Sequence, residues 1–232
     1  MSTIAGEPTT SPPEPRPGNR RRSRAVTAVI VVCVALAIAA SALVSSRPLA
    51  TDTMTESVPA GDLTEVEITA NGGIRLTAST DDRVKIDVTR AWTFRAPAAT
   101  SSVTGGALSL NGSCLDIRVG SCSVAYGVAV PGHVAVAVRA LGASIEGSNL
   151  TTRELRATSS GGDIVATFAN RPDRVAVESS GGDIELVVPA GPYRVDAQSS
   201  GGGVQVDVVQ DPDAANLLIA KSSGGDIRIS RR

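Results

Sequence analysis

Aromatic side chains are scarce in this chain of 232 residues, where they make up only 2% of the sequence. They are Trp92, Phe94, Tyr126, Phe168 and Tyr193. This scarcity argues against a core built on large rings, and it leaves few of the aromatic platforms on which enzymes hold sugars. The apolar content of 42% therefore comes mostly from aliphatic side chains, which suits β-strands built from valine, isoleucine, leucine and alanine.

Histidine is almost absent as well. The single histidine, His133, follows Pro131-Gly132, and a histidine in such a position is typical of a loop rather than of a ligand or a base. With one histidine, neither a serine–histidine–aspartate triad nor a zinc site can be assembled convincingly. The sequence therefore predicts no catalytic residue, no metal site and no cofactor, and we expect that the protein is not an enzyme.

The net charge is small, at −1, but it is unevenly spread. Residues 1–46 hold five arginines and two glutamates, which gives +3, and residues 47–232 hold 17 basic and 21 acidic side chains, which gives −4. A weakly acidic main region lacks the basic footprint of proteins that bind nucleic acid. We expect no nucleic-acid partner.

The N-terminal region predicts a membrane anchor. Residues 1–24 are rich in proline, serine and arginine and are expected to form a disordered basic tail. Residues 25–44 carry no charge, and as a helix they would span about 30 Å, the thickness of the bilayer core. The preceding arginines place the tail in the cytoplasm and the rest of the chain outside. A cleaved signal peptide is the alternative, because Ala40-Ser41-Ala42 resembles a cleavage site.

The segment after the predicted membrane helix is polar. Residues 45–62 contain Pro48 and Pro59 and are expected to form a stalk or linker. Alternating apolar and polar residues begin after it, so residues 63–232 are assigned to one extracytoplasmic β domain. The region from 63 to 130 is less regular than the rest and is expected to form irregular early coils or a cap.

A Ser-Ser-Gly-Gly motif returns four times, starting at Ser159, Ser179, Ser199 and Ser222. The starts are 20, 20 and 23 residues apart, and repeats of this length are typical of stacked architectures. Apolar residues alternate on both sides of each motif, which indicates strands with one buried face. On one side they are Leu155, Val175, Val195 and Leu218 with Ala157, Val177, Ala197 and Ala220; on the other they are Ile164, Ile184, Val204 and Ile227 with Ala166, Leu186, Val206 and Ile229.

Stacking explains this pattern best, because one repeat cannot cover its own apolar face. The sequence favours a right-handed parallel β-helix or solenoid with coils of about 20 residues, and a meander of hairpins is the alternative. Successive repeats should lie on successive rungs, which places Ile184 between Ile164 and Val204. The glycines are expected to supply positive φ values at the corners.

The corner residues are the candidate sites that the sequence offers. They are Gly161, Gly162, Asp163, Gly181, Gly182, Asp183, Gly201, Gly202, Gly224, Gly225 and Asp226. Stacked coils would bring the aspartates about 4.8 Å apart, where a cation could relieve their repulsion. Gly203 interrupts the row, however, and an aspartate that bonds its own turn backbone is the favoured interpretation.

Three cysteines remain. Cys33 lies within the predicted membrane helix, where we interpret it as an apolar filler. Cys114 and Cys122 flank a short glycine-rich loop outside the membrane, and the oxidising environment there favours a disulfide between them. A metal site would need further ligands.

These features together resemble a known family. Cys114-Leu-Asp-Ile-Arg-Val-Gly-Ser-Cys122, Val128-Ala-Val-Pro-Gly-His-Val134 and the serial Ser-Ser-Gly-Gly-Asp-Ile corners are similar to the bacterial "putative adhesin" β-strand-repeat family of unknown function. The resemblance covers residues 62–232. It implies a right-handed β-helix domain on a cell envelope, and it carries no catalytic residue over to this chain.

The sequence thus predicts a single-pass membrane protein of the cell envelope. Its external solenoid would serve as an adhesin-like surface for binding or scaffolding, with a cell-wall polymer or an envelope protein as partner. An envelope-stress accessory that signals through the basic tail is one alternative. A β-helix enzyme that acts on polysaccharides is another, and the few aromatic residues speak against it.

Overall fold

The computed structural model describes residues 49–114 and 120–232. This part of the chain is all-β and forms 18 strands. The strands are β1 (Ala50–Pro59), β2 (Glu65–Ala70), β3 (Ile74–Ala78), β4 (Arg83–Trp92), β5 (Ala98–Thr104), β6 (Ala107–Ser113), β7 (Cys122–Val130), β8 (Ala135–Ala140), β9 (Ile145–Leu150), β10 (Glu154–Ser159), β11 (Ile164–Phe168), β12 (Arg174–Ser179), β13 (Ile184–Val188), β14 (Pro192–Ser199), β15 (Val204–Asp207), β16 (Val209–Gln210), β17 (Leu217–Ser222) and β18 (Ile227–Arg231).

The predicted tail at 1–24 and the predicted membrane helix at 25–44 lie outside the described residues. Within residues 49–114 and 120–232, no helix has the length and apolar character needed to cross a membrane.

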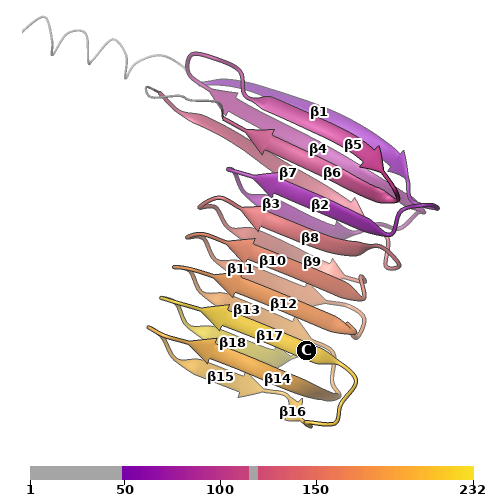
Figure 1. Ribbon diagram of the computed structural model, residues 1–232, viewed down its shortest axis with the longest axis vertical. Helices are drawn as coiled ribbons and strands as arrows, with labels where there is room; N and C mark the ends of the chain where they lie inside the picture. Colours follow the sequence, from indigo (N-terminus) through magenta and orange to yellow (C-terminus); the bar gives the residue numbers. More distant parts are fainter. Residues whose placement is uncertain (1–48, 115–119) are drawn as a thin grey trace, which may run out of the picture. The chain divides into compact units, whose positions relative to one another are not determined.

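The strands form two sheets of nine strands each (Figure 1). The first sheet has the order β1-β4-β7-β3-β9-β11-β13-β18-β15, and the second has the order β16-β14-β17-β12-β10-β8-β2-β6-β5. Their inner faces share one hydrophobic core of valine, isoleucine, leucine and alanine, joined by Tyr126, Phe168 and Tyr193. The low aromatic content thus fits a core made of many small side chains.

Each repeat forms one coil that visits both sheets. In the coil that starts at β10, the chain runs along the second sheet, turns at Ser159-Ser-Gly-Gly and returns along β11 in the first sheet. Strand β10 pairs in parallel with β12, and β11 pairs in parallel with β13. The repeats therefore stack as parallel coils and do not form a meander of hairpins.

The predicted alternation is confirmed by burial. Leu155, Val175 and Leu218 are each at most 1% exposed, and so are Ile164, Ile184 and Ile227 across the corner. The repeat that contains Val204 differs, because this side chain is 44% exposed. This exposure follows from the order of the coils.

The coils at the C-terminal end do not stack in sequence order. The last coil, β17–β18, lies between the coil β12–β13 and the coil β14–β15. Ile184 therefore pairs with Ile164 on one side and with Ile227 on the other. The expectation that Val204 lies next to Ile184 is wrong, because Val204 belongs to the terminal rung and pairs with Ile227.

The other end of the stack has the same kind of interleaving. The first coil, β2–β3, lies between the coil β6–β7 and the coil β8–β9. Strands β1, β4 and β5 then cap this end by antiparallel pairing. Region 63–130, for which the sequence predicted irregular early coils or a cap, thus contains two regular coils together with the capping strands β4 and β5.

The β domain begins earlier than the sequence predicted. Ala50–Pro59, which the sequence assigned to the linker at 45–62, form strand β1 and pair with β4 over the whole length of β1. Nearly all side chains of β1 are exposed, so the segment lacks the apolar alternation of the other strands. An edge strand at the end of a stack needs no continuous apolar face. An ion pair between Asp52 and Arg90 of β4 helps to fasten it to the sheet.

The buried Tyr126 makes the stability of the domain depend on pH in the alkaline range. Its side chain in β7 is 2% exposed, its hydroxyl has no hydrogen-bond partner within the described residues, and burial raises its pKa from 10.0 to about 12. The unfolded chain releases this proton near pH 10, whereas the folded chain keeps it. The contribution of Tyr126 to stability is therefore fully present below about pH 10. Between about pH 10 and pH 12 the free energy of unfolding falls by up to about 1.4 kcal/mol per pH unit because of this group.

We expect Tyr126→Phe to remove this part of the loss in denaturant titrations at pH 9 and 11. An equal loss in both proteins would contradict the assignment.

Candidate functional site

The first serine of each Ser-Ser-Gly-Gly motif joins neighbouring coils. Ser179 Oγ donates to the carbonyl oxygen of Gly162 on the adjacent rung (3.1 Å) and accepts a hydrogen bond from the N–H of Gly182 (3.0 Å). Equivalent pairs of hydrogen bonds are made by Ser159, Ser199 and Ser222. These hydroxyls are satisfied within the corner, so their role is structural.

The second glycine of each motif is required by close stacking. A Cβ atom on Gly182 would lie 2.5 Å from the carbonyl carbon and oxygen of Gly162, and one on Gly225 would lie 2.3 Å from the carbonyl oxygen of Gly182. The expected positive φ is wrong for these corners, because every glycine with positive φ in the described chain lies outside the Ser-Ser-Gly-Gly motifs. The corners need glycine because the backbones of adjacent coils almost touch.

The aspartates of the corners form a ladder with backbone N–H groups. Asp163 Oδ1 accepts the N–H of Asp183 (2.9 Å), and Asp183 Oδ1 accepts the N–H of Asp226 (2.8 Å). Asp226 Oδ1 then accepts the N–H of Gly203 (2.7 Å). Gly203 stands at the end of this row and does not interrupt it, because its coil is the terminal rung.

This ladder predicts that the aspartates act without a cation. We expect Asp183→Ala to lower the free energy of unfolding by about 1 kcal/mol, because the N–H of Asp226 loses its acceptor. Asp183→Asn keeps an oxygen at this position and should lose less. Thermal unfolding with and without a chelator is the measurement, and a midpoint that falls on chelation in the wild type would contradict the ladder.

The predicted disulfide between Cys114 and Cys122 is confirmed. Asn71, at the corner between β2 and β3, donates from Nδ2 to Cys114 Sγ (2.9 Å) and to the carbonyl oxygen of Cys122 (3.2 Å). Its Oδ1 accepts the N–H of Val124 (3.0 Å). One side chain thus ties the disulfide to a corner of the stack, which makes the disulfide part of the scaffold.

His133 lies in a loop, as its sequence context indicated. Its Nε2 is 3.3 Å from the carbonyl oxygen of Ala60 and 3.7 Å from Asp82 Oδ1. Among residues 49–114 and 120–232, no group of three or more histidine, cysteine, aspartate or glutamate side chains is placed to hold a metal ion.

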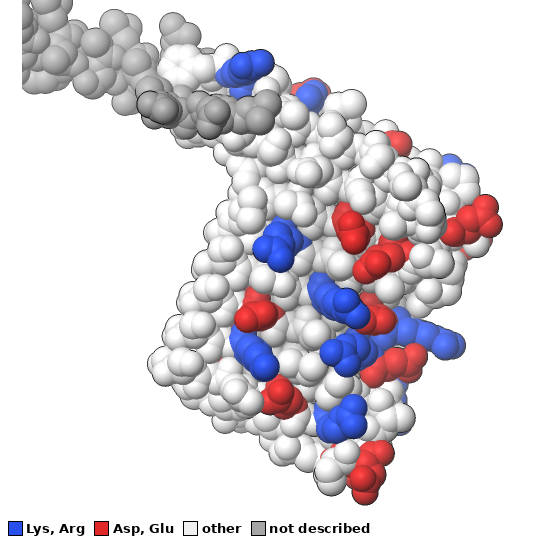
Figure 2. Space-filling view, viewed as in Figure 1, with Lys and Arg blue, Asp and Glu red and all other residues white. Residues whose placement is uncertain are grey.

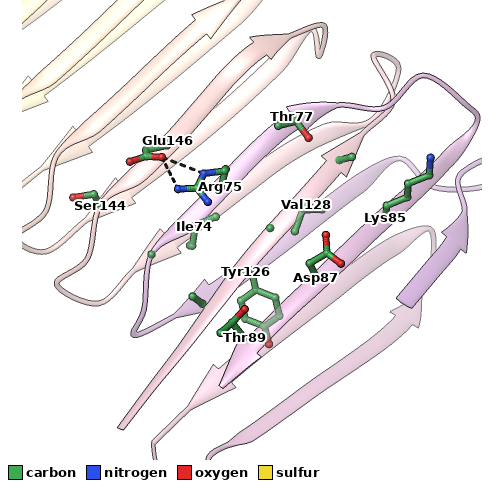
Figure 3. A pocket seen from close by; sticks show the side chains of 14 residues that line it. Ile74, Arg75, Thr77, Lys85, Asp87, Thr89, Tyr126, Val128, Ser144 and Glu146 are labelled. Carbon is green, nitrogen blue, oxygen red and sulfur yellow. Dashed lines mark hydrogen bonds and ion pairs between the residues drawn. The ribbon is translucent and has the colours of Figure 1, made fainter. Parts of the chain in front are cut away.

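An open groove of about 500 Å³ on the outer face of the first sheet is the candidate binding site (Figure 3). Strand β7 forms its floor with the small residues Ala125, Gly127 and Ala129, and β3 and β4 flank β7 on its two sides. The small residues alternate with Val124, Tyr126 and Val128, whose side chains are buried in the core. The groove exists because longer side chains on the flanking strands rise beside this floor.

Charges of both signs line the groove. Gly127 is the register partner of Arg75 on β3 and of Asp87 on β4, so a basic and an acidic residue stand on opposite sides of a position without a side chain. Arg75 is paired with Glu146 of β9 at 3.1 Å, and Lys85 is paired with Asp81 at 3.0 Å. The arrangement offers donors and acceptors to a polar chain that lies along β7.

This groove was not predicted from the sequence. A signal was present in the small residues at 125, 127 and 129, but their meaning depends on which strands flank β7. The pairing of β7 with β3 and β4 joins segments that are distant in sequence, and no local pattern encodes it.

The face seen in Figure 2 has no large patch of one charge sign. Acidic and basic side chains are interspersed over the face seen in Figure 2. Such a surface suits contacts made by shape and hydrogen bonds better than attraction of a highly charged polymer.

Fold and surface together define the class of the protein as a capped, two-sheet β-solenoid domain with an open groove on one outer face. The family Toastrack DUF4097 matches residues 40–232, and the chain belongs to this family of domains of unknown function. The resemblance drawn from the repeat motifs is thereby confirmed.

A solved structure supports the fold. A "putative cell adhesion protein" from Clostridium sporogenes is 12% identical, with 79% of this chain and 100% of that chain covered and a TM-score of 0.55. A "putative adhesin" from Bacteroides fragilis is 16% identical, with 77% of this chain and 97% of that chain covered and a TM-score of 0.35. No curated protein matches the chain.

Proposed function

We propose that this protein is a single-pass membrane protein of the cell envelope whose right-handed solenoid binds an envelope component without catalysis. Residues 1–24 form the cytoplasmic tail, residues 25–44 span the membrane, and the β domain lies outside. The partner is a cell-wall polymer or an extended segment of an envelope protein.

The groove over β7 is the observation that carries this proposal. It is open, about 500 Å³ in volume, and lined by both donors and acceptors, which suits a polar chain better than a compact apolar ligand. Its floor lies on a strand with hydrogen-bonded neighbours on both sides, so the site is formed before the ligand arrives.

Two further observations support the proposal. The Cys114–Cys122 disulfide fits an oxidising compartment outside the membrane. The solved structure with the same fold carries a name that describes cell adhesion.

Filling the groove tests the binding function. The Cβ of a larger residue at position 127 would meet Asp87 Cβ at 3.6 Å, an ordinary contact, so Gly127→Tyr fits the sheet and blocks the floor. We expect this variant to lose at least about tenfold in retention on isolated cell-wall polymers and envelope protein fractions, because the ligand and the ring compete for one space. Val187→Tyr, on the outer face of β13, is the matched control and should bind like the wild type. Equal binding by all three proteins would place the binding site elsewhere.

Protease treatment of intact cells tests the topology. We expect added protease to remove the domain after residue 44 and to leave residues 1–24 protected by the membrane. Release of a soluble form that begins near residue 43 would instead show that the apolar segment is a cleaved signal peptide.

A further inference from the structure

The C-terminal coil, residues 217–232, occupies a slot inside the stack. Strand β17 pairs in parallel with β12 on one side and β14 on the other, and β18 pairs in the same way with β13 and β15 (Figure 1). The coils on either side of the slot both precede it in the chain. Residues 217–232 therefore lie between two coils that are formed by earlier residues.

Contacts on both sides define the slot. The coil buries Leu218, Ala220, Ile227 and Ile229, each at most 1% exposed. On the inner side, Ser222 Oγ donates to the carbonyl oxygen of Gly182 (3.1 Å). On the outer side, Ser199 Oγ donates to the carbonyl oxygen of Gly225 (2.7 Å). The slot therefore fits a coil that has this apolar spacing and this corner.

The aspartate ladder explains why this coil, and not its predecessor, fills the slot. In the observed order each corner N–H at 183, 226 and 203 meets a carboxylate from the preceding rung. In sequence order Gly203 would precede Asp226, and the N–H of Asp226 would have no carboxylate to bond. Gly203 thus marks the coil that is suited to the terminal rung.

The coil is joined to the rest of the domain by one short segment, residues 211–216, which follows β16. Pro212 and Asp213 in its middle are exposed, and the segment is held at its two ends. Asp211 N donates to the carbonyl oxygen of Tyr193 (2.9 Å), and Asn216 Nδ2 donates to the carbonyl oxygen of Pro172 (2.7 Å). The disulfide joins β7 to the end of β6 and does not tie the coil in place.

We propose that two copies of this chain associate by exchanging their C-terminal coils. Residues 217–232 of each copy enter the slot of the other, and every contact described above is kept between copies instead of within one. Only the connecting segment changes its path, which is why exchange of an identical element costs little. A second copy is the partner because it alone carries this coil with its matched corner. The proposal does not depend on the function of the groove.

Linked cysteines test the exchange. Two tagged full-length chains are co-expressed, both with Cys33→Ser, one with Glu185→Cys and the other with Arg228→Cys. These two positions are register partners on β13 and β18. We expect a disulfide between the two tagged chains at least about fivefold above the background from a second pair, in which Glu67→Cys replaces Arg228→Cys. Adducts no more frequent than in this control would overturn the proposal.

A shorter connection provides a second test. Deletion of residues 212–214 should hinder entry of the coil into the slot of its own chain. Because the coil can then enter the slot of a second copy instead, the fraction of dimer should increase. We expect the deletion to raise the dimer fraction measured by light scattering at least about fivefold, with the 185–228 link found between chains. A folded protein that stays monomeric, with the disulfide formed within one chain, would contradict the exchange. If the variant fails to fold, the co-expression experiment decides between the two outcomes.

Discussion

Truncation of Ile184 to alanine is expected to lower the free energy of unfolding by about 2–5 kcal/mol. Ile184 is 1% exposed and stands in a column with Ile164 on one side and Ile227 on the other. The neighbouring coils are held by backbone hydrogen bonds, so they cannot collapse into the space that the missing methyl groups leave. Denaturant unfolding of the purified protein measures the loss.

Glu185→Ala is the matched control, since Glu185 is the next residue on the same strand and is exposed on its outer face. We expect its effect to stay below about 0.5 kcal/mol. Similar losses in both variants would show that the two faces of β13 are not distinguished in the way the structure describes.

Gly182→Ala is expected to destabilise the stack by about 1–3 kcal/mol or more. The added methyl group would lie 2.5 Å from the backbone of Gly162, and backbone atoms within a stack of coils have little room to move. The effect is an overpacking effect, because Gly182 does not have a positive φ and no left-handed strain is involved.

The first glycine of the same corner provides the comparison. A Cβ on Gly181 would meet Gly161 Cα at 3.6 Å, which is an ordinary contact. Gly181→Ala should therefore cost less than Gly182→Ala by at least about 1 kcal/mol in the same unfolding experiment. An inverted order of the two variants would contradict the stacking geometry at the corner.

The repeat period and the alternation of apolar residues were sufficient to predict stacked coils and their buried faces. Leu155, Ile164 and their equivalents could be assigned to the core because the strand period of two depends only on local sequence. The disulfide could be predicted for a similar reason, since Cys114 and Cys122 are close in the chain.

The order of the coils could not be predicted from the repeat alone. Every coil offers the same corner and the same apolar spacing, so the period is compatible with any order of rungs. The replacement of aspartate by Gly203 was the one available signal, and its meaning emerges only when the ladder of carboxylates and N–H groups is seen.

The edge strand and the groove were missed for a different reason. The residues of β1 are mostly exposed, and their strand conformation depends on pairing with β4. The groove over β7 depends on which side chains of distant strands stand beside Gly127. Both features arise from long-range pairing, which local periodicity does not record.

The position of the C-terminal coil inside the stack is tested most directly by pairs of cysteines in one chain with Cys33→Ser. Residues 185 and 228 are partners on adjacent strands, where the Cα separation of about 5 Å permits a disulfide. Residues 185 and 205 are separated by two rungs, or about 10 Å, which is too far. We predict that mild oxidation links Glu185→Cys to Arg228→Cys and leaves Glu185→Cys and Gln205→Cys unlinked; a link between 185 and 205 with none between 185 and 228 would contradict the interleaved order.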